Sequence, residues 1–431
     1  MDDAARALRD AWRDGDRLFD LVDPADWTAR PIPLRHPILF YVGHLPAFAW
    51  RHLAVAHLGA PPLDATLDRL FQRGIDPASL DEARRATPAA WPTVEEVLDY
   101  RDRARAALDP ELDGLAARPR HEAREALAMV LEHELMHHET LMYMLARVPP
   151  DRLRAPDGWR EPRGGEGRAP GRVLVRGGPV TLGADRVEGR FGWCCEHPRR
   201  VERVGDFEID DLPVTVGRYL RFVEEGGYDD PRWWPRGRPA AGHPASWRRV
   251  GGRWQVRSPL RWHDLDDVSG WPAQVSLVEA EAYAARAGRR VPSEAELHRA
   301  AYTGPAGEDR PYPWGDAPPA PERGAFDFTV QGPIPVGRHP AGASAWGVEE
   351  LVGNGWEWTR TPFVRWEGFR AHLPTYPGYS ADFFDGEHHV VFGASWCTRA
   401  RLLRRSFRNW YRRDYPYVFA TFRTVAAPEA G

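Results

Sequence analysis

A segment rich in proline, glycine and charge divides this chain into two stretches of different texture. Residues 149–172 hold little apolar content, which is typical of a linker. Segments with helical apolar periodicity precede it, and short β segments with many Gly, Trp and turn residues follow it. Because 431 residues exceed one ordinary core, we expect an α+β protein with a helical domain over residues 1–150, a linker over 151–172 and a second domain over 173–431.

The charge and cysteine content excludes several partners and chemistries. The 58 basic and 62 acidic residues give a net charge of −4, which offers no electrostatic basis for binding nucleic acid or an anionic membrane. Every basic residue is Arg, so lysine Schiff-base chemistry is excluded. Three Cys make no disulfide framework, the first residues lack the apolar core of a signal peptide, and no apolar run approaches the roughly 20 residues of a membrane span. We expect a cytoplasmic protein that acts on small molecules.

The first 150 residues are typical of a helical bundle. Apolar positions at helical spacing predict helices over 3–21 and 38–50, with a shorter helix within 62–92. Thr93 and Glu96 form a capping box for a helix over 94–108, and a last helix follows Pro119. Long helices joined by short loops predict a four-helix bundle, whose core is a usual place for a metal site.

Two histidines on the last of these helices are spaced to share one metal ion. His133 and His137 are four residues apart, so they project from the same helix face one turn apart. A purely structural pair is the alternative, but the apolar flanks favour metal ligation, because buried imidazoles need partners. Glu139 is expected to orient a ligand imidazole.

His44 is the candidate third ligand. It lies within the apolar run 38–50 with no other polar residue beside it. A lone histidine on an apolar face is usually a core residue, but a histidine pair that needs a third ligand favours coordination. Three neutral imidazoles suit zinc and iron(II) alike, so the residues alone do not distinguish between these two metals.

A zinc metallopeptidase is the rival that pattern alone offers. Residues 133–137 spell H-E-x-x-H, in which Glu134 would be the general base. Thr140 and Tyr143 stand where a metzincin needs Gly and the third His, and the chain then enters the linker. These departures disfavour a peptidase.

Several independent motifs follow one another in a fixed order along nearly the whole chain. They are residues 33–44, residues 71–77, the H-x3-H-x-E pattern of His133, His137 and Glu139, and residues 206–215, 288–296, 313–316, 353–359 and 393–396. Together they resemble the ergothioneine-type sulfoxide synthases, which are non-haem iron enzymes. The resemblance implies a DinB-like four-helix bundle followed by a formylglycine-generating-enzyme-like domain of the C-type-lectin class.

The resemblance also implies an oxygen-dependent formation of a carbon–sulfur bond. In that family, iron(II) binds hercynine (trimethylhistidine) together with a thiol; the imidazole carbon gains the sulfur, which becomes a sulfoxide. By motif, His44, His133 and His137 would hold the iron.

The resemblance places further residues of the implied site in the second domain. Tyr376 is similar to the tyrosine that donates a proton or electron, with Tyr41 and Tyr100 as alternatives, because some branches supply this group from the helical domain. Asn409 and Trp410 resemble the pair that binds hercynine, where an aromatic face suits a trimethylammonium, although both are equally compatible with core positions. The residues expected to cap the iron are Tyr376, Tyr379, Asn409 and Trp410.

Departures from the bacterial branch favour free cysteine as the thiol donor. The branch that uses γ-glutamylcysteine carries Gln, an acid and Arg where this chain has Met136, Tyr411 and Tyr415, and the segments around His44 and Tyr376 resemble the fungal type more closely. Proximity to Trp410 makes three residues candidates for binding the carboxylate and amine of cysteine: Arg412, Arg413 and Asp414.

Other functions remain as alternatives. They are a synthase that uses γ-glutamylcysteine, an ovothiol-type synthase that uses histidine, and a non-catalytic lectin-like module that keeps the metal as structure. Formylglycine generation itself is disfavoured, because that chemistry needs two reactive cysteines near the C-terminus and only Cys397 lies there. The sequence predicts neither the oligomeric state nor the imidazole carbon that is attacked.

Overall fold

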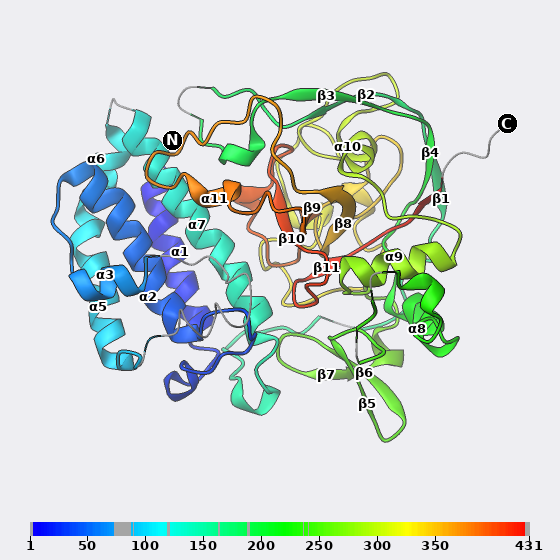
Figure 1. Ribbon diagram of the computed structural model, residues 1–431, viewed down its shortest axis with the longest axis horizontal. Helices are drawn as coiled ribbons and strands as arrows, with labels where there is room; N and C mark the ends of the chain where they lie inside the picture. The colour runs from blue at the N-terminus through cyan, green and yellow to red at the C-terminus, as the bar shows by residue number, and fades with distance from the viewer. Residues whose placement is uncertain are drawn as a thin grey trace. The chain divides into compact units, whose positions relative to one another are not determined.

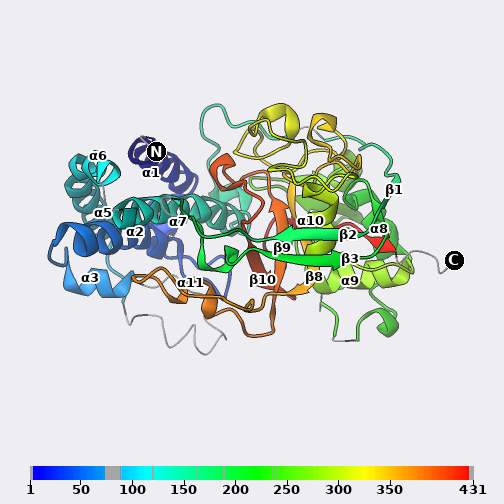
Figure 2. The ribbon, with the colours of Figure 1, turned by 90° about the horizontal axis from the view of Figure 1, so that it is seen from above.

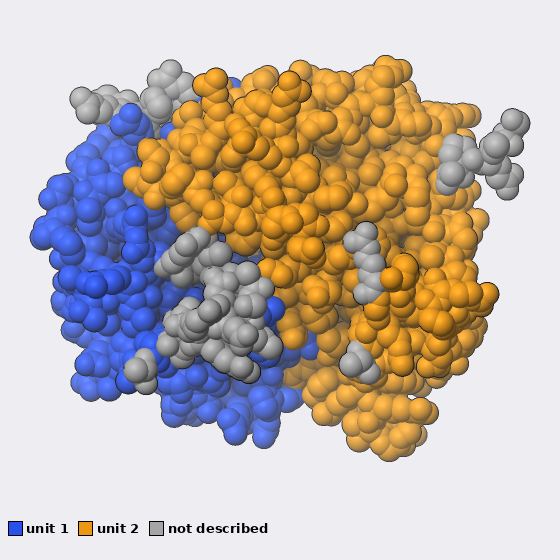
Figure 3. Space-filling view, in the orientation of Figure 1, with its two compact units in different colours: residues 1–159, 187–191 blue, residues 160–186, 192–431 orange. Residues whose placement is uncertain are grey.

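The computed structural model describes residues 3–72, 88, 90–118, 121–162, 164–187, 190–235, 237–239 and 241–426. The chain divides into two compact units: unit 1 is Met1–Trp159 with Val187–Phe191, and unit 2 is Arg160–Arg186 with Gly192–Gly431 (Figure 3). The boundary lies inside the stretch 151–172, because the part beyond Trp159 is hydrogen-bonded to the rest of unit 2. The amide of Gly165, for example, donates to the carbonyl of Asp267 at 2.7 Å.

Unit 1 is helical, as the sequence predicts (Figure 1). Its helices are α1 (Ala4–Phe19), α2 (Ile38–Ala49), η2 (Trp50–Leu58), α3 (Ala65–Leu70), α5 (Val94–Leu108), α6 (Leu112–Ala117) and α7 (His121–Leu145), with the short turns η1 (Pro24–Asp26), η3 (Asp109–Glu111) and η4 (Pro150–Arg152). Helix α7 packs against α1, α2, α6 and η2, and α2 packs against α5. Residues 73–87, which include most of the motif 71–77, lie outside the described residues.

Local sequence explains the boundaries of the helices that matter most. The capping box predicted at the start of α5 is present: the amide of Glu96 donates to Thr93 Oγ1 at 3.2 Å, and the amide of Thr93 donates to Glu96 Oε2 at 2.7 Å. All 12 residues of α2 are buried, so this helix has no solvent face. Pro46 offers no amide to the helix ladder, and four residues later the chain continues as the π-helix η2.

Unit 2 is rich in short strands and irregular segments. Its strands are β1 (Arg172–Val175), β2 (Gly178–Leu182), β3 (Arg200–Val204), β4 (Phe207–Asp210), β5 (Trp247–Val250), β6 (Arg253–Arg257), β7 (Trp262–Asp264), β8 (Gly355–Pro362), β9 (His388–Ala394), β10 (Asn409–Arg412), β11 (Ala420–Thr421) and β12 (Val425–Ala426). Its helices are α8 (Val216–Glu224), α9 (Leu277–Arg286), α10 (Glu294–Tyr302) and α11 (Gly378–Ala381), with the short turns η5 (Cys194–Glu196), η6 (Pro231–Trp233), η7 (Leu265–Val268), η8 (Pro321–Arg323), η9 (Pro340–Gly342) and η10 (Ala400–Leu402).

The strands form small sheets, of which the four-stranded one matters most for function. Its order is β10-β9-β8-β11, so β10 is an edge strand; the other sheets are β1-β4-β12, β5-β6-β7 and the pair β2-β3. Figure 2 shows the β2-β3 pair lying across α10. Five tryptophans of unit 2 are fully buried and fill its core: Trp193, Trp271, Trp356, Trp358 and Trp396. A helical first region followed by a sheet-rich second region confirms the predicted α+β class.

None of the helices in the described part of the chain combines the length and apolar character that crossing a bilayer demands. Cys194, Cys195 and Cys397 are buried and form no disulfide.

Candidate functional site

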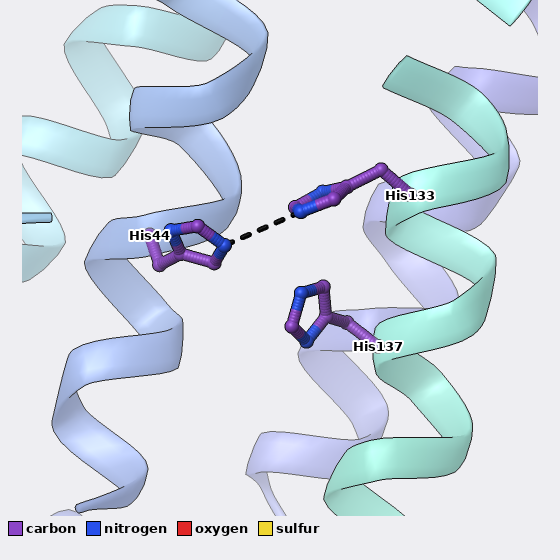
Figure 4. Close-up of side chains that lie close together, drawn as sticks. All are labelled: His44, His133 and His137. Atoms are coloured by element: carbon purple, nitrogen blue, oxygen red, sulfur yellow. Dashed lines mark hydrogen bonds between the residues drawn. The ribbon is translucent and has the colours of Figure 1, made fainter. Parts of the chain in front are cut away.

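Three imidazoles meet between two helices of unit 1. His44 comes from α2, while His133 and His137 come from successive turns of α7, and their rings face one another (Figure 4). One ring nitrogen from each lies within 4.8 Å of the others. The Nε2 atoms of His44 and His133 are 3.3 Å apart. Two nitrogens that each lie about 2.1 Å from one metal ion at ordinary coordination angles are separated by about this distance, so the geometry fits a shared ion.

A backbone carbonyl sets which nitrogen of His44 can bind a metal. Nδ1 of His44 donates to the carbonyl of Phe71 at 2.7 Å. A neutral imidazole that carries its proton on Nδ1 keeps a free lone pair on Nε2, which is the atom that faces His133. Phe71 therefore holds His44 in the tautomer that metal binding requires.

The surroundings keep all three imidazoles neutral. Burial lowers the pKa of His44 to about 4, although the hydrogen bond to Phe71 acts in the opposite direction. Burial also lowers the pKa of His133 and of His137 well below the ordinary value, and the neighbouring imidazoles lower both further. The three nitrogens are thus unprotonated donors at neutral pH, as zinc or iron(II) needs.

Aromatic rings set the planes of two of these imidazoles. Phe48 stacks on His133 with centroids 3.6 Å apart, and Phe40 stacks on His44 at 5.2 Å. Sequence reasoning did not single out Phe40, Phe48 or the carbonyl of Phe71. The signal was present, because Phe40 and Phe48 stand four residues before and after His44, one turn away along α2.

The two glutamates near the histidine pair occupy different environments. Glu139 is buried at 6% exposure, but Nδ1 of His137 has no hydrogen-bond partner among the described residues, so Glu139 does not hold that nitrogen. Glu134 faces α1: a Cβ placed on Gly15 would lie 3.4 Å from its Oε1. Burial raises the pKa of Glu134 to about 7. The general base that H-E-x-x-H chemistry requires therefore points at a neighbouring helix, which disfavours the peptidase alternative.

The two alternative tyrosines of unit 1 differ in their environment. The ring of Tyr41 lies 5.5 Å from that of His137. The hydroxyl of Tyr100 donates to Asp68 at 2.6 Å, and burial with this carboxylate raises its pKa. Tyr41 is thus the one that adjoins the histidine cluster.

In unit 2, the residues expected around hercynine form an aromatic cluster. Tyr379 lies 5.7 Å from Tyr376 and 5.4 Å from Trp410, measured between ring centroids. Trp193 stacks behind Tyr379 at 3.8 Å, and Phe363 stacks behind Trp410 at 4.0 Å. The cluster offers aromatic faces of the kind that bind a quaternary ammonium.

The polar residues expected beside Trp410 do not all share its surroundings. Asn409 and Trp410 are successive residues of β10, so their side chains project from opposite faces. Oδ1 of Asn409 accepts a hydrogen bond from the amide of Trp410 at 2.9 Å. Arg413 forms an ion pair with Glu281 of α9, and Asp414 is exposed.

Arg413 belongs to a separate cavity of about 380 Å³. Its walls come from η6, α9, the segment that follows α9 and β8, and they include four further arginines: Arg232, Arg289, Arg290 and Arg360. Trp410, Tyr379 and Tyr376 do not line it.

Family models match both regions of the chain. Residues 7–141 match the DinB superfamily, and residues 160–428 match the sulfatase-modifying factor enzyme 1-like domain. These matches agree with the predicted order of a DinB-like region and a formylglycine-generating-enzyme-like domain.

Similar proteins match across both regions. A hercynine oxygenase of Mycolicibacterium smegmatis is 39% identical over 71% of this chain and 72% of its own. A hercynine oxygenase of Mycolicibacterium thermoresistibile is 34% identical over 96% of this chain and 91% of its own. Ergothioneine biosynthesis protein 1 of Neurospora crassa is 30% identical over 92% of this chain and 54% of its own. Both the bacterial and the fungal type are thus among the similar proteins, as the motif resemblance leads us to expect.

Proposed function

We propose that this chain, which belongs to the hercynine oxygenase family, is an oxygen-using oxidoreductase. It joins hercynine to a thiol in ergothioneine biosynthesis. One C–H bond of the imidazole and one S–H bond are lost, and one C–S bond and one sulfoxide S–O bond are formed. Dioxygen is the oxidant: one of its atoms enters the sulfoxide and the other leaves as water. The observation that carries the proposal is the group of three neutral imidazoles in the DinB-like region.

The metal in this proposal is iron(II), held by His44, His133 and His137. Bound iron(II) would supply the open coordination positions and the electrons that dioxygen chemistry needs. Phe71 supports this role by fixing the tautomer of His44, and the stacked Phe48 excludes water from one face of His133. The donor set alone suits zinc as well, and the oxygen dependence of the family supports the choice of iron.

Residues of unit 2 are proposed to bind and orient the organic substrates. Trp410 and Tyr379 offer aromatic faces to the trimethylammonium of hercynine. Tyr376 is the proposed proton donor, because a phenol is a weak acid that holds its proton at neutral pH. Its place beside Tyr379, 5.7 Å away, supports that assignment.

Free cysteine is the proposed thiol donor. A γ-glutamyl group carries an additional carboxylate and amine that need polar partners. At two positions where the γ-glutamylcysteine branch has such partners, Tyr411 and Tyr415 stack on each other in parallel planes, 4° apart. Asp414 is exposed and free to meet the amine of cysteine, whereas Arg413 is engaged by Glu281. A cytoplasmic location belongs to the same proposal, since buried thiols without disulfides suit a reducing compartment.

A product assay tests the proposal directly. The chain is incubated with iron(II), oxygen, hercynine and either cysteine or γ-glutamylcysteine, and the products are identified by mass spectrometry. We expect hercynylcysteine sulfoxide from free cysteine, and no product when a chelator removes the metal. Product from γ-glutamylcysteine alone would overturn the choice of donor. Product from histidine and cysteine instead of hercynine would identify an ovothiol-type synthase, and no oxygen uptake by the iron-loaded chain would overturn the enzyme function.

A further inference from the structure

The side chains of Trp410, Arg412 and His388 lie on one face of the four-stranded sheet. Trp410 pairs with Val390 across the antiparallel strands β10 and β9, and Arg412 pairs with His388. Directly opposite residues project to the same face, as do residues two apart along a strand. Arg412 and His388 are therefore neighbours of each other and of Trp410.

Asp385 holds the imidazole of His388. Nδ1 of His388 lies 2.9 Å from Oδ2 and 3.0 Å from Oδ1 of Asp385, and the amides of Glu387 and His388 also donate to this carboxylate. With its proton on Nδ1 donated to Asp385, the neutral imidazole keeps a lone pair on Nε2, so His388 can accept but not donate a hydrogen bond at that atom. Burial lowers the pKa of His388, Asp385 acts against this effect, and Arg412 lowers the pKa further, which places Arg412 within electrostatic reach.

Phe383 connects this polar pair to the aromatic cluster. Its ring centroid lies 5.2 Å from that of His388 and 5.4 Å from that of Trp410. The segment that carries Phe383 follows α11, and Tyr379 of α11 also meets Trp410, at 5.4 Å. One face of the sheet thus presents aromatic rings beside a guanidinium and an oriented imidazole.

Unlike the arginines near it in the sequence, Arg412 has no carboxylate partner among the described residues. Arg408 is buried against Glu294 with a shortest N–O distance of 2.8 Å, and Arg413 pairs with Glu281. Arg412 makes no ion pair or side-chain hydrogen bond with any described residue, although its side chain is half-buried. A half-buried guanidinium that the protein itself does not satisfy is a ready partner for a ligand carboxylate.

We propose that Arg412, which lies beside the His388–Asp385 pair, binds the carboxylate of hercynine while Trp410 binds its trimethylammonium. This rests on the proposed function. The ammonium and the carboxylate of such a betaine are attached to one carbon, so their partners must be adjacent; residues two apart on a strand are about 7 Å apart at the backbone, which long side chains bridge. Asn409 projects from the opposite face and bonds the backbone of its neighbour.

Two ligands that differ only in the carboxylate test whether Arg412 binds that group of hercynine. We would titrate the iron(II)-loaded chain, without oxygen or thiol, with hercynine and with its decarboxylated analogue N,N,N-trimethylhistaminium, by calorimetry. Loss of a charge-assisted pair is expected to weaken hercynine binding about 10- to 100-fold in Arg412→Met. The affinity for the analogue, which has no carboxylate, is expected to stay the same. Arg412→Lys keeps the charge without the fork and should give an intermediate affinity.

Arg360→Met is the matched control, because Arg360 is exposed on β8 of the same sheet and lines the other cavity. It is expected to bind both ligands like the unaltered chain, with thermal unfolding confirming that each variant is folded. Equal weakening of both ligands by Arg412→Met, or no weakening, overturns the carboxylate assignment and leaves the proposed function intact. An unchanged affinity for hercynine with a raised KM for cysteine reassigns Arg412 to the thiol substrate and also overturns it. If the unaltered chain binds no hercynine, the proposed function fails as well.

Discussion

The ring of Phe48 lies flat on the imidazole of His133, with the planes 5° apart and the centroids 3.6 Å apart. Phe48 follows His44 by one turn of α2. One helix therefore supplies a nitrogen donor and also the surface that sets the plane of a second donor on α7. The arrangement makes the packing of α2 on α7 part of the metal site.

Replacing this ring tests its role in orienting His133. Phe48→Leu keeps an apolar side chain but removes the flat surface, and we expect iron(II) affinity to fall about 10-fold, as for other groups that orient a metal ligand. An anaerobic iron(II) titration measures it. Phe19→Leu is the control, since Phe19 is a buried ring of α1 that packs on Trp27; it should lower stability without changing metal affinity. Equal metal affinity in the two variants would contradict the prediction.

Metal binding is expected to depend on His44 and not on Glu134. His44→Ala removes one of three donors, so bound iron and hercynine-dependent oxygen uptake should both be lost. Glu134→Gln keeps the shape of a side chain that faces Gly15 of α1, and iron content should remain that of the unaltered chain. Metal analysis and an oxygen electrode measure the two properties. The opposite pattern, with Glu134 essential and His44 dispensable, would revive the peptidase alternative.

The sequence predicts the local parts of this site better than the distant ones. The spacing of His133 and His137 is a property of one helix, and it places both on one face. His44 is 89 residues away from His133, and its approach depends on how α2 packs on α7, which no local pattern encodes. Only the apolar setting of His44 and the motif resemblance pointed to it.

The arginines after Trp410 show a second limit of prediction from the sequence. Arg412 and Arg413 are equally near Trp410 in the sequence, and both were expected to bind substrate. They have different partners, because β10 ends at Arg412: Arg412 pairs in register with His388, and Arg413, just past the strand, pairs with Glu281 of α9. The position of His388 and Asp385 beside Arg412 was not predicted, because it depends on the register between β9 and β10, which is set by tertiary packing.

The identity of the proton donor can be decided by two conservative variants. Tyr376→Phe removes only the hydroxyl, and we expect kcat to fall about 100-fold or more with little change in KM for hercynine, as for loss of a general acid. Tyr41→Phe, beside His137 at 5.5 Å, should keep kcat near that of the unaltered chain. Steady-state oxygen uptake with both substrates measures these constants. A large loss in Tyr41→Phe alone would assign the donor to the helical region.

Acid should destabilise the chain through His298 of α10. Burial lowers the pKa of His298 to about 4 from an ordinary value of 6.5. Below pH 6.5, His298 is protonated in the unfolded chain but stays neutral in the folded chain. The free energy of unfolding therefore falls from pH 6.5 down to about pH 4, below which His298 causes no further loss. Between pH 7 and pH 5 the loss from this group is about 2 kcal/mol. Chemical unfolding at both pH values measures it, and His298→Leu should reduce the difference by that amount; an unchanged difference would contradict the assignment.

Two helical glycines allow a matched test of how Phe71 controls His44. A Cβ added to Gly43 of α2 would lie 2.4 Å from the ring of Phe71, whereas a Cβ added to Gly114 of α6 would meet nothing within 4 Å. Gly43→Ala must therefore displace the residue whose carbonyl accepts the Nδ1–H of His44 at 2.7 Å. We expect it to cost about 1–3 kcal/mol of folding free energy by overpacking and to weaken iron(II) binding, while Gly114→Ala leaves metal binding unchanged and stabilises its helix by up to about 1 kcal/mol. Denaturant unfolding and iron(II) titration of both variants measure these effects. Unchanged iron affinity in a destabilised Gly43→Ala variant would show that the Phe71 carbonyl does not set the orientation of His44.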